Sequence, residues 1–303
     1  MSFLVLLGAL LLAHYHPLPQ SFALERWHAR LCHALERSLN DGMARHGVIA
    51  WILAALLPAL LLGAGYIALR YSAAPLAVLL GLALLYLLLD VRGFAGPAEE
   101  ISVALRDNNI QHARERLAAW GHRQTDVLGA PELSRLTIEN TLMRAHYGLF
   151  APIFWFVLLG PAGALLYRMS HSLTRSWGNE DVAFNRVVHR IFDWLDWLPA
   201  RFSAISFAVV GDFEDALYCW RTQAPAWKTE AEGIILASGA GALGVRLGEP
   251  LPGGGVLEYR PELGLGDAAD ADYLMSAIGL VWRALVLMLA LLLLMTFAKW
   301  LGN

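Results

Sequence analysis

The stretch from Val48 to Leu69 contains about 22 residues and no charged side chain. The hydrocarbon core of a bilayer is about 30 Å thick, and a helix of about 20 apolar residues spans it. Within that core every backbone N–H and C=O group needs a partner from the protein itself, which a helix provides. The run therefore predicts a transmembrane helix, and it limits what the rest of the chain can fold into.

Further apolar segments extend this prediction to an all-α, polytopic membrane bundle of about four to six membrane segments, some of them re-entrant. Besides Val48–Leu69, these segments are 74–90, 147–167, 198–210 and 274–297. Gly160 and Pro161 fall within the third of them, and a proline there predicts a helix break at Gly160. The segment 198–210 is short for a complete crossing. We expect residues 1–303 to form a single membrane domain.

The composition agrees with a membrane protein and excludes other classes. The chain is 57% hydrophobic and 16% charged, whereas soluble domains average about 45–50% and about 25%. Its net charge of −3, with no block of like charge, argues against nucleic-acid binding, so the lipid bilayer is the expected partner. Cys32 and Cys219 lie far apart without a CxxC spacing, so they form no metal site by themselves.

Two polar segments, 92–144 and 211–272, are predicted to lie outside the bilayer. The first has helical periodicity and many arginines, which predicts a small helical subdomain on the cytoplasmic side. In the second, residues 251–272 are rich in proline and glycine and are predicted to be irregular.

Asp193 and Asp196 are the first candidate for chemistry. On a helix, side chains three residues apart share a face, and two carboxylates there could bind a divalent cation or act as acid and base. The alternative is a solvated first helical turn, where acids complement the helix dipole. His171 and Ser172 lack a nearby acid in the sequence, so no catalytic triad is predicted.

Arg201 and Arg283 are charges inside apolar segments. Such residues face a cavity, a partner or the membrane interface. A pairing with Asp193 or Asp196 would account for one of the two arginines.

The run Ser238–Pro250 contains four glycines together with Arg246 and Glu249. Glycine-rich backbone can cradle an anion, but no βαβ unit surrounds the run, so a dinucleotide fingerprint is excluded. The alternative is that the small residues let a helix pack closely against its neighbours.

Several motifs occur in an order that resembles the CbiB/CobD family of cobalamin biosynthesis. They are Ala113-Arg114, Arg123-Gln-Thr125, Glu139-Asn140, Ala151–Trp155, Gly160–Arg168, Asp193 with Trp197–Arg201, and Gly239–Gly248. The resemblance covers most of residues 106–250. It implies a bacterial inner-membrane protein, and an enzyme that uses ATP and a divalent cation such as Mg²⁺ to join aminopropanol or its phosphate to a corrinoid carboxylate.

Some polar residues of the family pattern are replaced in this sequence. Gln124 stands in place of an aspartate, His171 in place of an asparagine, Thr174 in place of an aspartate and Asp196 in place of an asparagine. This pattern resembles the divergent AmpE-like branch, which is associated with the signalling that induces β-lactamase. The first expectation is therefore a regulatory or sensory protein, and the alternative is the ATP-dependent synthase. A third is the binding of a phosphorylated or lipid-linked cell-wall metabolite.

The resemblance also implies roles for single residues. As an enzyme, the chain would use Asp193 to bind the cation, Arg246 to bind phosphate and Glu139 to polarise the amine. Asp196 would join these two acids in catalysis. The expected ligand-binding residues are Arg123, Asn140, His171, Arg201, Gly241, Gly244 and Arg246.

Overall fold

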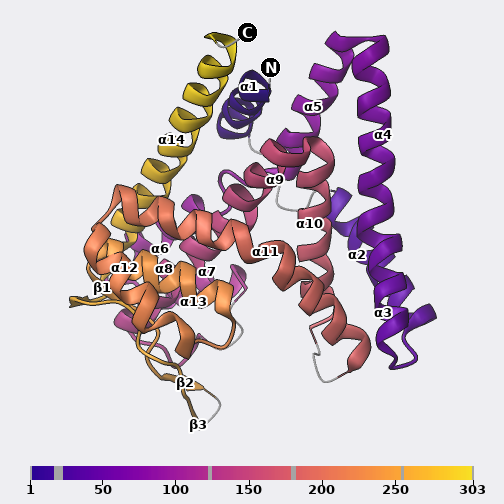
Figure 1. The fold of residues 1–303 in the computed structure, drawn as a ribbon. Helices are drawn as coiled ribbons and strands as arrows, with labels where there is room; N and C mark the ends of the chain where they lie inside the picture. Colours follow the sequence, from indigo (N-terminus) through magenta and orange to yellow (C-terminus); the bar gives the residue numbers. More distant parts are fainter. Residues whose placement is uncertain (1, 17–22, 122–124, 179–181, 254–255, 302–303) are drawn as a thin grey trace. The chain divides into compact units, whose positions relative to one another are not determined.

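The computed structural model describes residues 2–16, 23–121, 125–178, 182–253 and 256–301. Most of them are helical, so the prediction of an all-α membrane bundle is confirmed (Figure 1). The chain divides into two compact units, each made of two stretches of sequence. The first unit comprises residues 1–91 and 147–199, and the second comprises 92–146 and 200–303.

The first unit is built around a helical hairpin (Figure 1). Its arms, α4 (Leu57–Ser72) and α5 (Ala74–Leu88), are separated at Ala73, and Pro75 sits in the first turn of α5, where its missing N–H costs nothing. α1 (Ser2–Tyr15) packs on α5, and α10 (Pro161–Ser176) packs on α4 and α5. The remaining elements are α2 (Ala23–Leu39), α3 (Ala44–Trp51), the π-helical turn η1 (Ile52–Leu56), η2 (His146–Phe150), α9 (Ala151–Leu159) and part of α11 (Ala183–Val210).

The predicted helix break at Gly160 is present. α9 ends at Leu159 and α10 begins at Pro161, while Gly160 has φ +68°, a left-handed conformation that glycine adopts at little cost. The chain therefore turns between two helices within the segment 147–167.

Among the described residues, three helices are long and apolar enough to cross a membrane: Ala44–Ser72, Ala130–Leu159 and Ala271–Leu301. Phe3–Tyr15 and Ala74–Leu88 are shorter apolar helices. The first and last long helices contain the predicted segments 48–69 and 274–297. The middle one begins within 92–144, because α8 (Ala130–Ala145) continues through η2 into α9 without a break. Which segments lie outside the bilayer stays a prediction.

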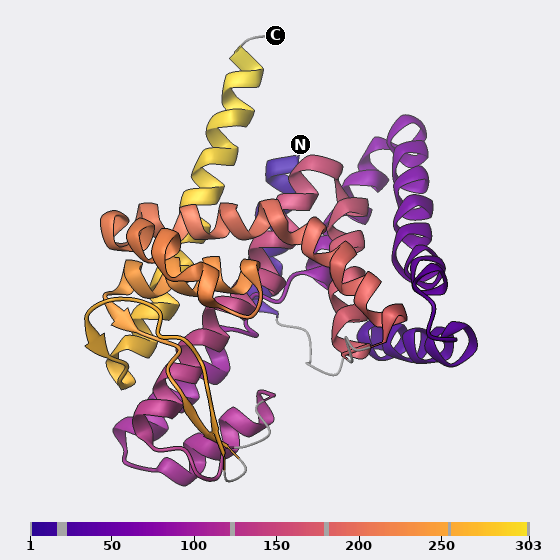
Figure 2. The same cartoon turned by 60° about the horizontal axis from the view of Figure 1, so that its bottom comes forward.

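The second unit packs α14 (Ala271–Leu301) against α6 (Ala95–Arg106) and α8, and packs α12 (Phe213–Thr222) against α13 (Glu230–Leu243). α7 (Ile110–Ala119) and the 3-10 turn η3 (Ala224–Ala226) complete its helices. The predicted irregular region also contains short strands. β1 (Val245–Arg246) pairs in parallel with β4 (Asp267–Ala268). β2 (Leu251–Gly253) forms an antiparallel hairpin with β3 (Val256–Glu258), which projects below the helices in Figure 1 and lies in front of the magenta helices in the turned view of Figure 2.

Two sequence boundaries differ from the prediction. The segment 198–210 is not a separate element, because it forms the end of the 28-residue helix α11, which continues through Pro199. The glycine-rich run is helical up to Leu243 and ends at Gly244, whose φ of +65° closes α13.

The helical half of the glycine-rich run serves close packing, as the alternative interpretation predicted. A Cβ atom on Gly239 would lie 2.6 Å from Leu142 Cδ1 of α8, and one on Gly241 would lie 2.5 Å from the Asp215 carbonyl oxygen of α12. The Leu142 side chain could shift to make room for the first, but the second contact is with backbone atoms, so glycine at position 241 is what lets α13 approach α12.

We expect Gly241→Ala to lower the free energy of unfolding by about 1–3 kcal/mol, because the added methyl group overlaps backbone atoms of α12 that cannot move independently. Gly279→Ala is the matched control, since a Cβ there meets nothing within 4 Å and alanine favours the helix. Unfolding in mixed micelles, followed by circular dichroism, would measure both variants. Equal stability of the two variants would contradict the packing role of Gly241.

Candidate functional site

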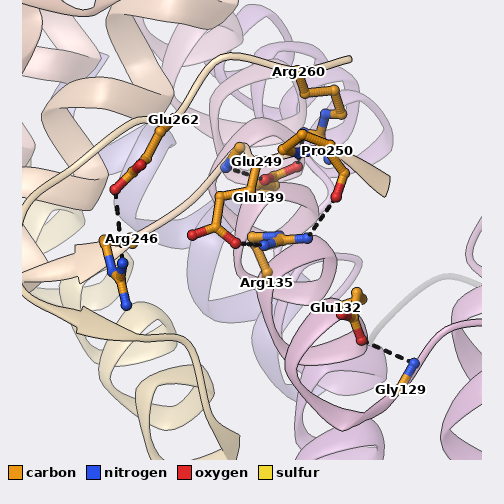
Figure 3. A network of polar contacts seen from close by, with 10 residues as sticks. Gly129, Glu132, Arg135, Glu139, Arg246, Glu249, Pro250, Arg260 and Glu262 are labelled. Carbon is orange, nitrogen blue, oxygen red and sulfur yellow. Dashed lines mark hydrogen bonds and ion pairs between the residues drawn. The ribbon is translucent and has the colours of Figure 1, made fainter. Parts of the chain in front are cut away.

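A network of arginines and glutamates joins α8 to the segment 246–262 in the second unit. Figure 3 shows Arg135 and Glu139 projecting from one helix toward the segment that carries Glu249, Pro250 and Arg260. Arg135 and Glu139 are four residues apart, which places them on the same helix face. We call this group the α8 network; its members are Arg135, Glu139, Arg246, Gly248, Glu249, Pro250, Arg260 and Glu262.

Glu139 is buried at the centre of the α8 network. One carboxylate oxygen accepts a hydrogen bond of 2.9 Å from the backbone N–H of Gly248, and the other forms an ion pair with Arg260. The guanidinium of Arg260 also lies over the ring of Trp227, 5.0 Å from its centroid. Glu139 therefore fixes two points of the segment 246–262 on α8.

Arg135 contacts the segment 246–262 at a third point. Its side chain is only 7% exposed and forms an ion pair with Glu249, while a second nitrogen lies 3.5 Å from the carbonyl oxygen of Pro250. Glu249 has φ +60° and follows Gly248, which has φ +73°. A left-handed conformation costs a non-glycine residue about 1–2 kcal/mol. The ion pair with Arg135 helps to hold Glu249 in it.

The α8 network contains more hydrogen-bond donors than it satisfies. Within the described residues, four buried nitrogens of this region have no hydrogen-bond partner: Arg135 Nε, Asn140 Nδ2, Arg246 Nε and Arg260 Nη1. Buried donors without an acceptor cost about 1–3 kcal/mol each, so a native structure usually supplies water or a ligand. The chemistry of this donor set suits an oxyanion such as phosphate or carboxylate.

The first unit contains a second polar centre, around Asp196. Asp196 is 1% exposed and accepts a hydrogen bond of 2.7 Å from the hydroxyl of Tyr167, which is also buried. The ring of His171 stacks on Tyr147 at a centroid distance of 4.3 Å, and both rings contact Phe192. The centre is thus largely aromatic, with one buried carboxylate.

Asp193 and Asp196 differ in environment, although both lie on α11. Asp193 is exposed and Asp196 is buried. The alternative of a solvated first helical turn is wrong, because α11 begins at Ala183, well before either residue. In the described part of the chain, no three histidines, cysteines, aspartates or glutamates are grouped as metal ligands. The role of Asp193 in binding a cation stays a prediction.

The two arginines of the apolar segments differ in their surroundings. Arg201 is partly buried and forms an ion pair with Glu230 at the start of α13; a pairing with Asp193 or Asp196 stays a prediction. Arg283 is exposed, and its Nε lies 3.4 Å from the Gly279 carbonyl oxygen within its own helix.

The remaining predicted residues are placed as follows. Arg246 lies on β1, 4.0 Å from Glu262, and Asn140 follows Glu139 on α8. Gly241 and Gly244 lie within and at the end of α13. Arg123 falls outside the described residues.

The sequence interpretation missed Arg135, Glu249 and Arg260 as members of the site. The spacing of Arg135 and Glu139 was a usable signal, because i,i+4 side chains meet on a helix. Arg260 gave no such signal, since it lies 121 residues from Glu139 in a region without periodicity.

The two cysteines are buried free thiols. Burial raises the pKa of Cys32 and of Cys219 to about 11. Both therefore stay protonated at neutral pH, which makes them poor nucleophiles and poor metal ligands.

Comparison with known proteins assigns the chain to a family. The family model described as CobD/Cbib protein matches residues 6–281. A cobalamin biosynthesis protein CobD from Stutzerimonas stutzeri (strain A1501) is 36% identical over 99% of this chain and 98% of its own length. Another from Chromobacterium violaceum is 37% identical over 71% of this chain and 70% of its own length. No solved structure matches the chain significantly.

These relatives overturn the first functional expectation. The assignment to a regulatory, AmpE-like role in β-lactamase induction is wrong, because relatives at 36–37% identity are named for cobalamin biosynthesis. The chain belongs to the CobD/Cbib protein family.

Proposed function

We propose that this chain is the amide-forming synthase of cobalamin biosynthesis, located in a bacterial inner membrane. It would join aminopropanol or its phosphate to a carboxylate of a corrinoid in an ATP-dependent reaction. The observation that carries the proposal is the 36% identity to a CobD protein over 99% of this chain. The α8 network supports it, because it joins two of the motifs that resemble the family, Glu139-Asn140 and the glycine-rich run.

The reaction requires a carboxylate to become an acyl donor. ATP with Mg²⁺, when bound, supplies the activating group that turns a carboxylate oxygen into a leaving group. The amine then attacks the acyl carbon, losing a proton while the activated oxygen departs. The chain must therefore bind phosphate, orient a carboxylate and an amine, and exclude water, which would otherwise hydrolyse the activated acyl group.

The residues of the α8 network are suited to binding phosphate. Arg135, Arg246 and Arg260 each retain a buried nitrogen without a partner among the described residues, and guanidinium groups match phosphate geometry. Arg246 would contact the phosphate, as the family resemblance implies. Mg²⁺ needs only one or two protein carboxylates beside phosphate oxygens and water. Asp193 belongs to the first unit, and its exposed carboxylate is proposed separately as a ligand of the cation, as the family resemblance implies.

Glu139 has a different task from the one expected. Both of its oxygens are engaged, by Gly248 N–H and by Arg260. It would therefore hold the segment 246–262 in position rather than polarise the amine. In this role Glu139 is a positioning residue.

We expect the chain to restore cobalamin-dependent growth to a bacterial strain that lacks its own cobinamide synthase. Asp193→Ala should abolish growth, because it removes the proposed ligand of the cation. Glu214→Ala is the matched control, since Glu214 is another exposed acid on a helix, and it should support normal growth. Failure of the intact, membrane-inserted protein to restore growth would refute the synthase proposal.

A second prediction concerns the buried ion pair. Glu139→Gln keeps an acceptor for Gly248 N–H but leaves the charge of Arg260 without a partner. Breaking a buried ion pair in this way lowers the free energy of unfolding by about 3–5 kcal/mol. Glu262→Gln removes a more exposed partner, 4.0 Å from Arg246, which is worth about 0–1 kcal/mol. Denaturation in mixed micelles would measure the free energy of unfolding of both variants. A similar decrease in the two would count against a central role for Glu139.

A further inference from the structure

Glu249, the ion-pair partner of Arg135, has no role in the reaction as proposed so far. The two side chains differ in one respect that matters for binding. Arg135 is 7% exposed and projects from a helix, whereas the side chain of Glu249 is 35% exposed and projects from a connecting segment. Arg135 is thus a fixed group, and Glu249 is the partner that can leave.

We propose that Arg135 and Arg260 form a binding site for an oxyanion of the substrates, and that the Glu249 carboxylate fills this site in the ligand-free chain. The inference rests on the proposed function, since a phosphate and a carboxylate are the oxyanions of that reaction. Binding of the ligand would displace Glu249 from Arg135.

The geometry of Glu249 favours its displacement. Its φ of +60° is unfavourable for a residue with a side chain, so the released segment could relax toward ordinary backbone angles. The second contact of Arg135, to the Pro250 carbonyl oxygen, is long at 3.5 Å. Arg135 Nε has no hydrogen-bond partner among the described residues. A ligand with several oxygens would satisfy this guanidinium better than Glu249 does.

Arg260 supplies the second half of the site. Glu139 and Trp227 hold its guanidinium in place, yet its Nη1 is buried and has no hydrogen-bond partner within the described residues. Because its anchor Glu139 lies one turn from Arg135 on the same face of α8, both guanidinium groups are fixed to that face.

The charge balance explains why an anion would be bound. The α8 network pairs three arginines with three glutamates: Arg135 with Glu249, Arg246 with Glu262, and Arg260 with Glu139. When Glu249 moves out, one buried positive charge is left without its partner. An incoming oxyanion restores the balance.

The test is binding of pyrophosphate, and separately of propionate, to the full-length chain in nanodiscs, measured by calorimetry. Glu249→Gln should lower the Kd for one of these probes about tenfold, because the probe no longer competes with a carboxylate. Arg135→Gln should raise that Kd at least tenfold. Glu214→Gln, which changes an exposed carboxylate on α12 outside the network, should leave it unchanged. A response to pyrophosphate identifies a phosphate subsite, and a response to propionate alone identifies a carboxylate subsite.

An unchanged or higher Kd in Glu249→Gln for both probes would overturn the inference. If Glu249→Gln is destabilised, thermal unfolding tests the same point. The probe that binds should raise the Tm of the variant by more than it raises the Tm of the unmodified chain. An equal or smaller rise would refute the site. Failure of the two proposals can be told apart. Tighter binding without amide synthesis contradicts only the proposed function, whereas synthesis without the Glu249→Gln effect contradicts only the site.

Discussion

The buried ion pair between Glu139 and Arg260 is the interaction on which the second unit's polar site depends. It joins a helix to a segment more than a hundred residues later, and the hydrogen bond from Gly248 N–H adds a second attachment to the same carboxylate. Removing one partner of such a pair leaves a charge without compensation, which costs more than the pair contributes. The segment 246–262 is therefore held with Arg260 against α8.

Buried polar groups in an apolar chain are stabilised by partners. Asp196 accepts a hydrogen bond from Tyr167, and the ring of His146 lies 2.8 Å from the Ser203 hydroxyl. Around the α8 network, four buried nitrogens have no hydrogen-bond partner among the described residues. Their concentration in one region, on cationic and amide side chains, points to a ligand.

The sequence predicted features that depend on local chemistry. Val48–Leu69 lies within the helix Ala44–Ser72 because hydropathy is a local property, and the break occurs at Gly160 because one residue takes a left-handed conformation there. The sequence did not predict Arg260 or Glu249 as site residues, since their partners are distant along the chain. The four replaced polar residues led to the AmpE-like expectation, which was wrong, because single positions weigh less than identity over 99% of the chain.

The reaction proposed for this chain is the formation of an amide on a corrinoid. Mass spectrometry of the corrinoid would detect it after incubation with the purified chain in nanodiscs, an amine substrate, ATP and Mg²⁺. We expect a product heavier by the amine less one water, formed only when ATP is present. An unaltered corrinoid, with protein that is folded and binds pyrophosphate, would contradict it.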